Sequence, residues 1–110
     1  MRAIHNMKKI NKRSMAHKVI KSEISALNSM LRKINKDFEK ACDTILKCKG
    51  KVITIGIGKS SYIAAKTAAT FSSTGTPSMF LHAAEALHGD MGVVSKDDVV
   101  LFFFKFWRNE

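Results

Sequence analysis

Proline, cysteine and long apolar runs are all scarce in this sequence. One proline among 110 residues, of which 45% are hydrophobic, argues against a disordered chain, and the length fits one small domain. No apolar run approaches the roughly 18 residues that a membrane span needs. The N-terminus also lacks the continuous apolar core of a signal peptide. We therefore expect a cytoplasmic protein.

The two cysteines, Cys42 and Cys48, are six residues apart. This spacing matches neither a Cys-x-x-Cys redox pair nor a zinc-ligand pattern, and two cysteines do not make the disulfide scaffold of a secreted domain. We predict that both thiols are buried and reduced.

Acidic residues are missing from the first 21 positions, and the charge of the chain is uneven. Residues 1–51 hold 14 basic and 4 acidic side chains, whereas residues 52–110 hold 5 of each. The cations of residues 1–21 could serve RNA, an anionic lipid surface or no specific partner. Because this segment has no aromatic side chain for base stacking, we favour a solvated basic tail over residues 1–14, with no nucleic-acid and no membrane partner.

A helical region follows this tail, over residues 15–49. Its apolar residues recur in steps of four and three, which is the period of an amphipathic helix, and Gly50 fits a helix stop. The stripe consists of Ile20, Ile24, Leu27, Leu31, Ile34, Phe38, Ala41 and Ile45. Because an isolated amphipathic helix is marginal in water, the stripe must pack on the following sheet or on a second copy of the chain. We expect a homo-oligomer.

An α/β pattern occupies residues 50–104. Three short apolar runs, 51–55, 78–81 and 99–104, are typical of buried strands. A helix is predicted between the first two, over about 62–73, and a shorter helical stretch over 83–88. Strands alternating with helices predict a parallel sheet covered by helices. Ligands of such sheets bind at the carboxyl ends of the strands, so the loops after Ile55 and Leu81, and the segment after the third strand, should make the site.

The turn from Gly56 to Ser61 is the first candidate for chemistry. It joins a strand to a helix N-terminus, where free backbone N–H groups and the helix dipole favour an anion such as phosphate. Lys59 could neutralise a phosphate or polarise a carbonyl oxygen. The turn is not a nucleotide-binding P-loop, since Ile53 stands where a glycine is required, nor a dinucleotide fingerprint, since Ser61 replaces the third glycine. An ordinary strand-to-helix turn remains the alternative.

His82, Glu85 and His88 are spaced by three and form a second candidate. On a helix they would lie within reach of each other, as metal ligands do, although zinc sites need a better defined set. We expect no metal, and leave open a polar site role or a structural role for His88. Thr74, with Ser72 and Ser73, could simply end a helix.

Residues 41–101 closely resemble the first half of the sugar isomerase (SIS) domain of D-arabinose 5-phosphate isomerases. The resemblance runs over some sixty residues without a gap. It is carried by the runs Cys48-Lys49-Gly50-Lys51-Val52, Gly56-Ile57-Gly58-Lys59-Ser60, Ala68-Ala69-Thr70-Phe71, Ser73-Thr74-Gly75-Thr76-Pro77 and Ala84-Glu85-Ala86-Leu87-His88-Gly89-Asp90-Met91-Gly92.

The resemblance implies a flavodoxin-like α/β fold and the interconversion of D-ribulose 5-phosphate and D-arabinose 5-phosphate, the first step toward the Kdo sugar of lipopolysaccharide. It implies no cofactor. Lys59 and His88 match residues of the family's site, and we expect them to be catalytic. The expected substrate-binding residues are Gly58, Ser60, Ser61, Thr74 and Glu85. An isomerase of this kind moves a proton through an enediol, so it needs a base and a donor that stabilises the oxyanion.

The chain departs from the family pattern in three places. Ser61 and Tyr62 stand where the family has glycine and histidine, and Ala83 stands where it has proline. After Leu101 the family continues with a stretch ending in Ser-Asn-Ser-Gly-Glu, which supplies phosphate-binding hydroxyls and a catalytic glutamate. Here residues 102–110 read FFFKFWRNE.

Reading the codons allowed for residues 104–110 one nucleotide later yields Ser-Asn-Ser-Gly-Glu-Thr among the permitted sequences. We therefore expect a change of reading frame near residues 102–104, a partial SIS domain over 15–110 and an aberrant tail over 102–110. The predicted function is an N-terminal fragment of an isomerase, inactive alone. The alternative is a non-catalytic module or subunit that binds sugar phosphates. An apolar sheet edge left uncovered at the third strand would favour self-association.

Overall fold

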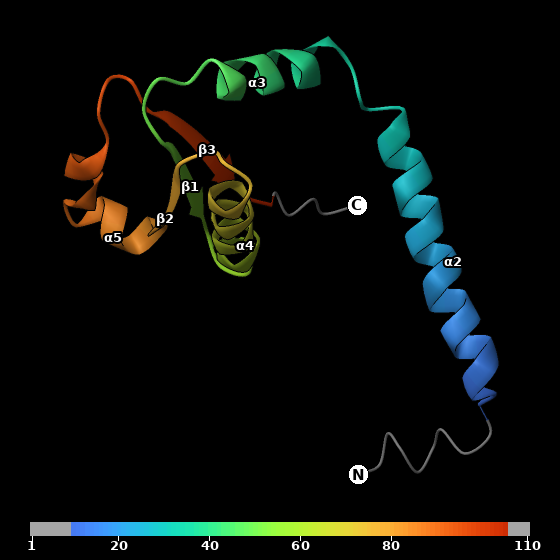
Figure 1. Cartoon of the computed structure of the whole chain (residues 1–110). Coiled ribbons are helices and arrows are strands. Elements are labelled where there is room, and N and C mark those ends of the chain that lie inside the picture. The colour runs from blue at the N-terminus through green and yellow to red at the C-terminus, as the bar shows by residue number, and fades with distance from the viewer. Residues whose placement is uncertain (1–9, 106–110) are drawn as a thin grey trace. The chain divides into compact units, whose positions relative to one another are not determined.

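The computed structural model describes residues 10–105, and the chain falls into two units, residues 1–39 and 40–110 (Figure 1). Two helices come first, α2 (Lys12–Leu31) and α3 (Lys36–Leu46). The α/β part then consists of β1 (Val52–Gly56), α4 (Ser60–Ser73), β2 (Ser78–His82), α5 (Ala83–Leu87), the 3₁₀ helix η2 (Asp90–Val93) and β3 (Val99–Phe103). None of the described helices is both long and apolar enough to cross a membrane.

The predicted helical region of residues 15–49 is interrupted, because asparagine side chains cap two separate helices. The Asn35 carboxamide oxygen accepts hydrogen bonds from the backbone N–H groups of Asp37 at 3.0 Å and Phe38 at 3.3 Å. This cap begins helix α3. Asn11 caps α2 in the same way, so the helix begins at Lys12, inside the predicted tail of residues 1–14. Residues 1–9 of that tail lie outside the described part. No residue of α2 is buried, and the predicted partner of its apolar stripe stays a prediction.

The three strands form one parallel sheet in the order β2-β1-β3, which confirms the predicted α/β class. Val52 is in register with Ser78 of β2 and with Val99 of β3. The central strand β1 is buried along its whole length, because both neighbours and both faces are covered. The carboxyl ends of all three strands therefore lie at one edge of the sheet, as the sequence predicted.

Helix α4 packs on one face of β1 through small side chains. Ala64 and Ala68 are buried against the sheet. On the same face, Thr54 is completely buried and its hydroxyl donates to the carbonyl oxygen of Ala64 at 2.6 Å. This bond satisfies the buried hydroxyl and holds α4 close to the strand.

The opposite face of the sheet carries a small apolar core of Ile53, Ile55 and Leu81. Side chains of the α5–η2 region, including Ala86 and Val94, pack against it. In Figure 1, α5 and α4 lie on different sides of the strands. The sheet is thus flanked by helical segments, as the resemblance implied.

Strand β3 leaves an apolar row uncovered. Val100, Phe102 and Phe104 are 41%, 46% and 53% exposed, and the rings of the two phenylalanines meet edge to face at 5.8 Å between centroids. The structure therefore has the apolar surface that the sequence predicted at this strand. Self-association through it stays a prediction, and residues 106–110 of the predicted aberrant tail lie outside the described part.

The amino ends of β1 and β3 are joined by a charged pair. The side chain of Asp98 is 1% exposed, and its carboxylate forms an ion pair with the ammonium of Lys51 at 2.8 Å. The carboxylate also accepts hydrogen bonds from the backbone N–H groups of Lys51 at 2.9 Å and Ser95 at 2.7 Å. Gly50 lies so close that a Cβ there would meet this carboxylate. The glycine predicted as a helix stop is therefore also required by this contact.

The two thiols are free and half-buried, so the prediction that they are buried is wrong. Cys48 lies beside the same junction, where its Sγ is 3.5 Å from the carbonyl oxygen of Asp97. Cys48 therefore lies at a polar junction at the amino ends of the strands and not among the buried side chains of the core.

We expect Asp98→Asn to lower the free energy of unfolding at neutral pH and to remove part of its acid dependence. The Lys51 ammonium, followed by the backbone N–H groups of Lys51 and Ser95, holds the pKa of Asp98 well below its ordinary value. The carboxylate therefore stabilises the fold above its unfolded pKa of about 3.9, and this contribution is lost as the pH falls through the lower folded pKa. Urea unfolding at several pH values measures the effect.

Asp97→Asn is the matched control, because Asp97 is exposed and only its backbone carbonyl oxygen takes part in the junction. Equal urea midpoints for the two variants across the pH range would contradict the prediction.

Candidate functional site

The turn that joins β1 to α4 is held in a defined conformation by backbone hydrogen bonds. Gly58 has a φ of +59°, a left-handed conformation that side chains rarely adopt, and open space lies where its Cβ would be. The N–H groups of Ser60 and Ser61 donate to the carbonyl oxygens of Ile57 at 3.1 Å and Gly58 at 3.0 Å. The glycine therefore leaves the backbone of the turn accessible from outside.

Gly56 allows α4 to begin directly on the end of β1. A Cβ at this position would lie 2.6 Å from the carbonyl oxygen of Ser60 and 2.6 Å from the backbone nitrogen and Cα of Ser61. These are backbone atoms that cannot rotate away. The sequence placed Gly56 in the turn, but its packing role became visible only in the structure.

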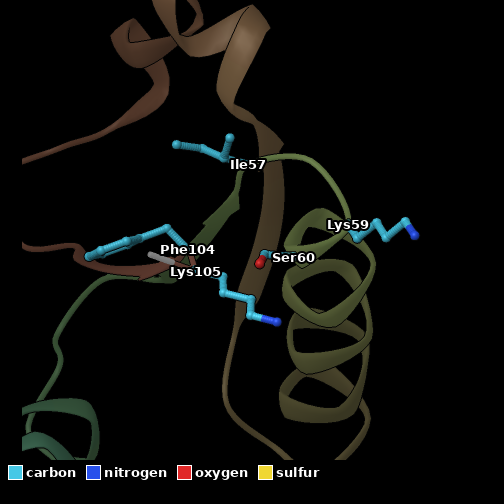
Figure 2. A pocket seen from close by; sticks show the side chains of 5 residues that line it. All are labelled: Ile57, Lys59, Ser60, Phe104 and Lys105. Atoms are coloured by element: carbon cyan, nitrogen blue, oxygen red, sulfur yellow. The ribbon is translucent and has the colours of Figure 1, made fainter. Parts of the chain in front are cut away.

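A hollow of about 470 Å³ lies beside this turn (Figure 2). It is lined by Ile57, Lys59, Ser60, Phe104 and Lys105. Residues from the turn after β1 and from the segment after β3 thus share one cavity, as predicted for the carboxyl edge of a parallel sheet. The pairing is anchored by the N–H of Ile57, which donates to the carbonyl oxygen of Phe103 at 3.3 Å.

The lining of this hollow is mainly apolar, and the features that favour an anion lie in the turn at its edge. Within residues 10–105, the backbone N–H groups of Gly58 and Lys59 have no hydrogen-bond partner, whereas those of Ser60 and Ser61 are used within the turn. The positive end of the α4 dipole lies here, and both ionisable side chains of the lining are lysines. The predicted residues Gly58, Lys59, Ser60 and Ser61 therefore lie together.

The side chain of Lys59 is exposed and points away from the hollow in Figure 2. Its ammonium has no partner among the described residues. Because the lysine stem has four rotatable carbons, the ammonium can move to a ligand in the hollow without breaking a contact.

His88 and Glu85, on or just after α5, do not line the hollow; both are exposed. Nδ1 of His88 lies 2.6 Å from the carbonyl oxygen of Ala84. A carbonyl oxygen only accepts, so Nδ1 carries a proton in this contact, and Nε2 is the acceptor nitrogen whenever the ring is neutral. The structure does not bring this imidazole to the hollow that Lys59 lines.

Thr74 lies at the other end of α4, away from the glycine turn. Its hydroxyl donates to the carbonyl oxygens of Thr70 at 2.8 Å and Phe71 at 3.2 Å, as expected of a residue that ends a helix. A helix of 14 residues, as α4 is, spans roughly 20 Å. Within this chain, Thr74 is therefore not brought together with Lys59.

The metal alternative for His82, Glu85 and His88 finds no support in the geometry. Among residues 10–105, no three His, Cys, Asp or Glu side chains converge into a group that could hold a metal ion. The ring of His82 instead packs edge to face against Phe80, with centroids 4.6 Å apart.

A parallel sheet flanked by helices, with a glycine turn and two lysines at its carboxyl edge, is an α/β arrangement of the kind that binds ligands at that edge. Residues 45–106 match the family model of the SIS domain. This match covers more than half of the 110 residues, and the chain belongs to the SIS domain family.

Curated proteins that are similar in sequence to this chain are named for a particular enzyme of this family. The chain is 54% identical over 86 residues to the arabinose 5-phosphate isomerase KdsD of Pseudomonas aeruginosa, covering 78% of this chain and 26% of that protein. It is 48% identical over 83 residues to the protein of the same name from Yersinia pestis, covering 76% and 25%. The chain spans about a quarter of the length of these curated relatives.

A solved structure agrees with these similarities. A protein of Escherichia coli CFT073, solved in complex with arabinose 5-phosphate, has a TM-score of 0.75 and 43% identity to this chain. The superposition covers 84% of this chain and 51% of that one.

Proposed function

We propose that this chain carries the phosphate-binding part of an aldose-ketose isomerase site for D-arabinose 5-phosphate and D-ribulose 5-phosphate. The observation that carries the proposal is the accessible glycine turn with Lys59 beside the hollow. This turn lies in the segment that is similar to arabinose 5-phosphate isomerases. The free N–H groups of Gly58 and Lys59 suit phosphate oxygens, and phosphate is the group that distinguishes this substrate class from neutral sugars.

The reaction needs one proton to move between adjacent carbons. A base removes the proton from C2 of the aldose while O1 gains a proton, which forms the enediol. The enediol then loses the proton on O2 and gains one at C1 to give the ketose. Nε2 of His88 is available as an acceptor for the C2 proton, and the Lys59 ammonium can stabilise the charge that develops on O1.

A second function, a non-catalytic module that binds sugar phosphates, is favoured by one observation. His88 and Glu85 lie outside the hollow that Lys59 and Ser60 line. We therefore expect the 110-residue chain by itself to bind the substrate and to turn it over weakly. The phosphate part of the site needs only the β1–α4 turn, whereas proton transfer needs a base next to the substrate carbon.

A titration of arabinose 5-phosphate into ¹⁵N-labelled chain tests the proposal. We expect saturable shifts of the Gly58 and Lys59 amide signals, and none with unphosphorylated D-arabinose at the same concentration. A coupled assay on the same sample separates the two functions, because measurable turnover, even if weak, identifies the isomerase, and binding without turnover identifies the module. Amide signals that stay in place with arabinose 5-phosphate would refute both.

A further inference from the structure

Lys105 lines the same hollow as Lys59, although it comes from the segment after β3. The pairing of β1 with β3 places it there. Gly56 is in register with Phe103, and the N–H of Ile57 donates to the Phe103 carbonyl oxygen. Lys105 follows only two residues later, so it lies beside the turn as a consequence of the sheet register.

The charge of Lys105 is uncommitted. Within residues 10–105 its ammonium makes no hydrogen bond and no ion pair, and its side chain is exposed. Figure 2 shows this side chain running toward α4, whereas the side chain of Lys59 extends outward from the start of α4, away from the hollow. A long cation without a partner beside a turn that favours an anion is available for a ligand.

We propose that Lys105 binds the phosphate group of the ligand in this hollow, as a second cation beside Lys59. The inference rests on the proposed function and extends it. A phosphate monoester carries about two negative charges at neutral pH, which one lysine does not balance. Two lysines from separate loops therefore select a phosphorylated sugar over a neutral one, with Lys105 determining specificity and taking no part in proton transfer.

The test is a titration of inorganic phosphate and of arabinose 5-phosphate into the 110-residue chain and its variants at fixed ionic strength. We expect Lys105→Ala to weaken both ligands about fivefold, the scale of one exposed ion pair. Lys105→Arg, which keeps the charge, should stay within about twofold of the original chain. The control is Lys96→Ala, because Lys96 is an exposed lysine in the turn before β3, at the amino edge of the sheet.

The outcomes separate this inference from the function on which it rests. One outcome is that Lys59→Ala weakens phosphate binding, while Lys105→Ala changes the affinity as little as Lys96→Ala does. This outcome would overturn the role of Lys105 and leave the proposed function intact. A loss with Lys105→Arg as large as with Lys105→Ala would also overturn it, because charge would not be the cause. No binding of either ligand to the original chain would overturn both proposals.

Discussion

Replacing Lys59 with alanine is expected to weaken the binding of arabinose 5-phosphate by about 10- to 100-fold, which corresponds to the loss of one hydrogen bond to a charged group. The side chain is exposed and begins at the end of the turn beside the hollow, so its removal takes away charge without disturbing the core. Isothermal titration calorimetry of the purified chain measures the change in affinity.

Lys66→Ala is the control for this experiment, since Lys66 is an exposed lysine on the same helix, α4, beyond its first turn. Equal affinities of the Lys59 and Lys66 variants would show that Lys59 does not contact the ligand. Lys59→Arg keeps the charge and should recover most of the binding.

Gly56→Ala is expected to lower the free energy of unfolding by about 3 kcal/mol, at the upper end of the usual cost of overpacking. The added Cβ would lie 2.6 Å from backbone atoms of Ser60 and Ser61, so the first turn of α4 must move away from β1. Because this turn follows Gly58 and Lys59 directly, we also expect weaker binding of arabinose 5-phosphate. Chemical denaturation followed by circular dichroism gives the stability.

Gly92→Ala is the matched substitution, because no atom lies within 4 Å of its added Cβ and its φ is not positive. Its effect on the free energy of unfolding should stay within about 0.5 kcal/mol, as for most exposed positions. Equal free energies of unfolding for Gly56→Ala and Gly92→Ala would contradict the close contact between α4 and the end of β1.

Much of the fold followed from local patterns. The apolar runs of residues 51–55 and 78–81 predicted β1 and β2 to within one residue at each end, and the alternation of strands and helices predicted that helices cover the sheet. The helical region was predicted less well. Its apolar period continues through residues 32–35, but the side chain of Asn35 caps a new helix there, and a periodic pattern of apolar residues does not show such a local hydrogen bond.

Some residues of the candidate site were predictable from the sequence, and others were not. Gly58, Lys59, Ser60 and Ser61 are neighbours in the chain, so the turn that holds them was visible in the sequence. Thr74 resembled a family site residue, yet α4 carries it to the opposite end of the helix. Lys105 falls within the predicted aberrant tail of residues 102–110, yet it lines the hollow, as expected of the segment that follows the third strand.

The amino-acid order alone determined the alternation of helices and strands, the glycine turn and the membership in the SIS domain family, since each depends on neighbouring residues or on a contiguous match. Tertiary structure decided which distant residues come together: Lys51 pairs with Asp98, and the turn that holds Lys59 shares one hollow with Lys105. The physical reason is that sheet pairing and helix crossover bring together residues separated by dozens of positions, and periodicity along the chain carries no record of those contacts.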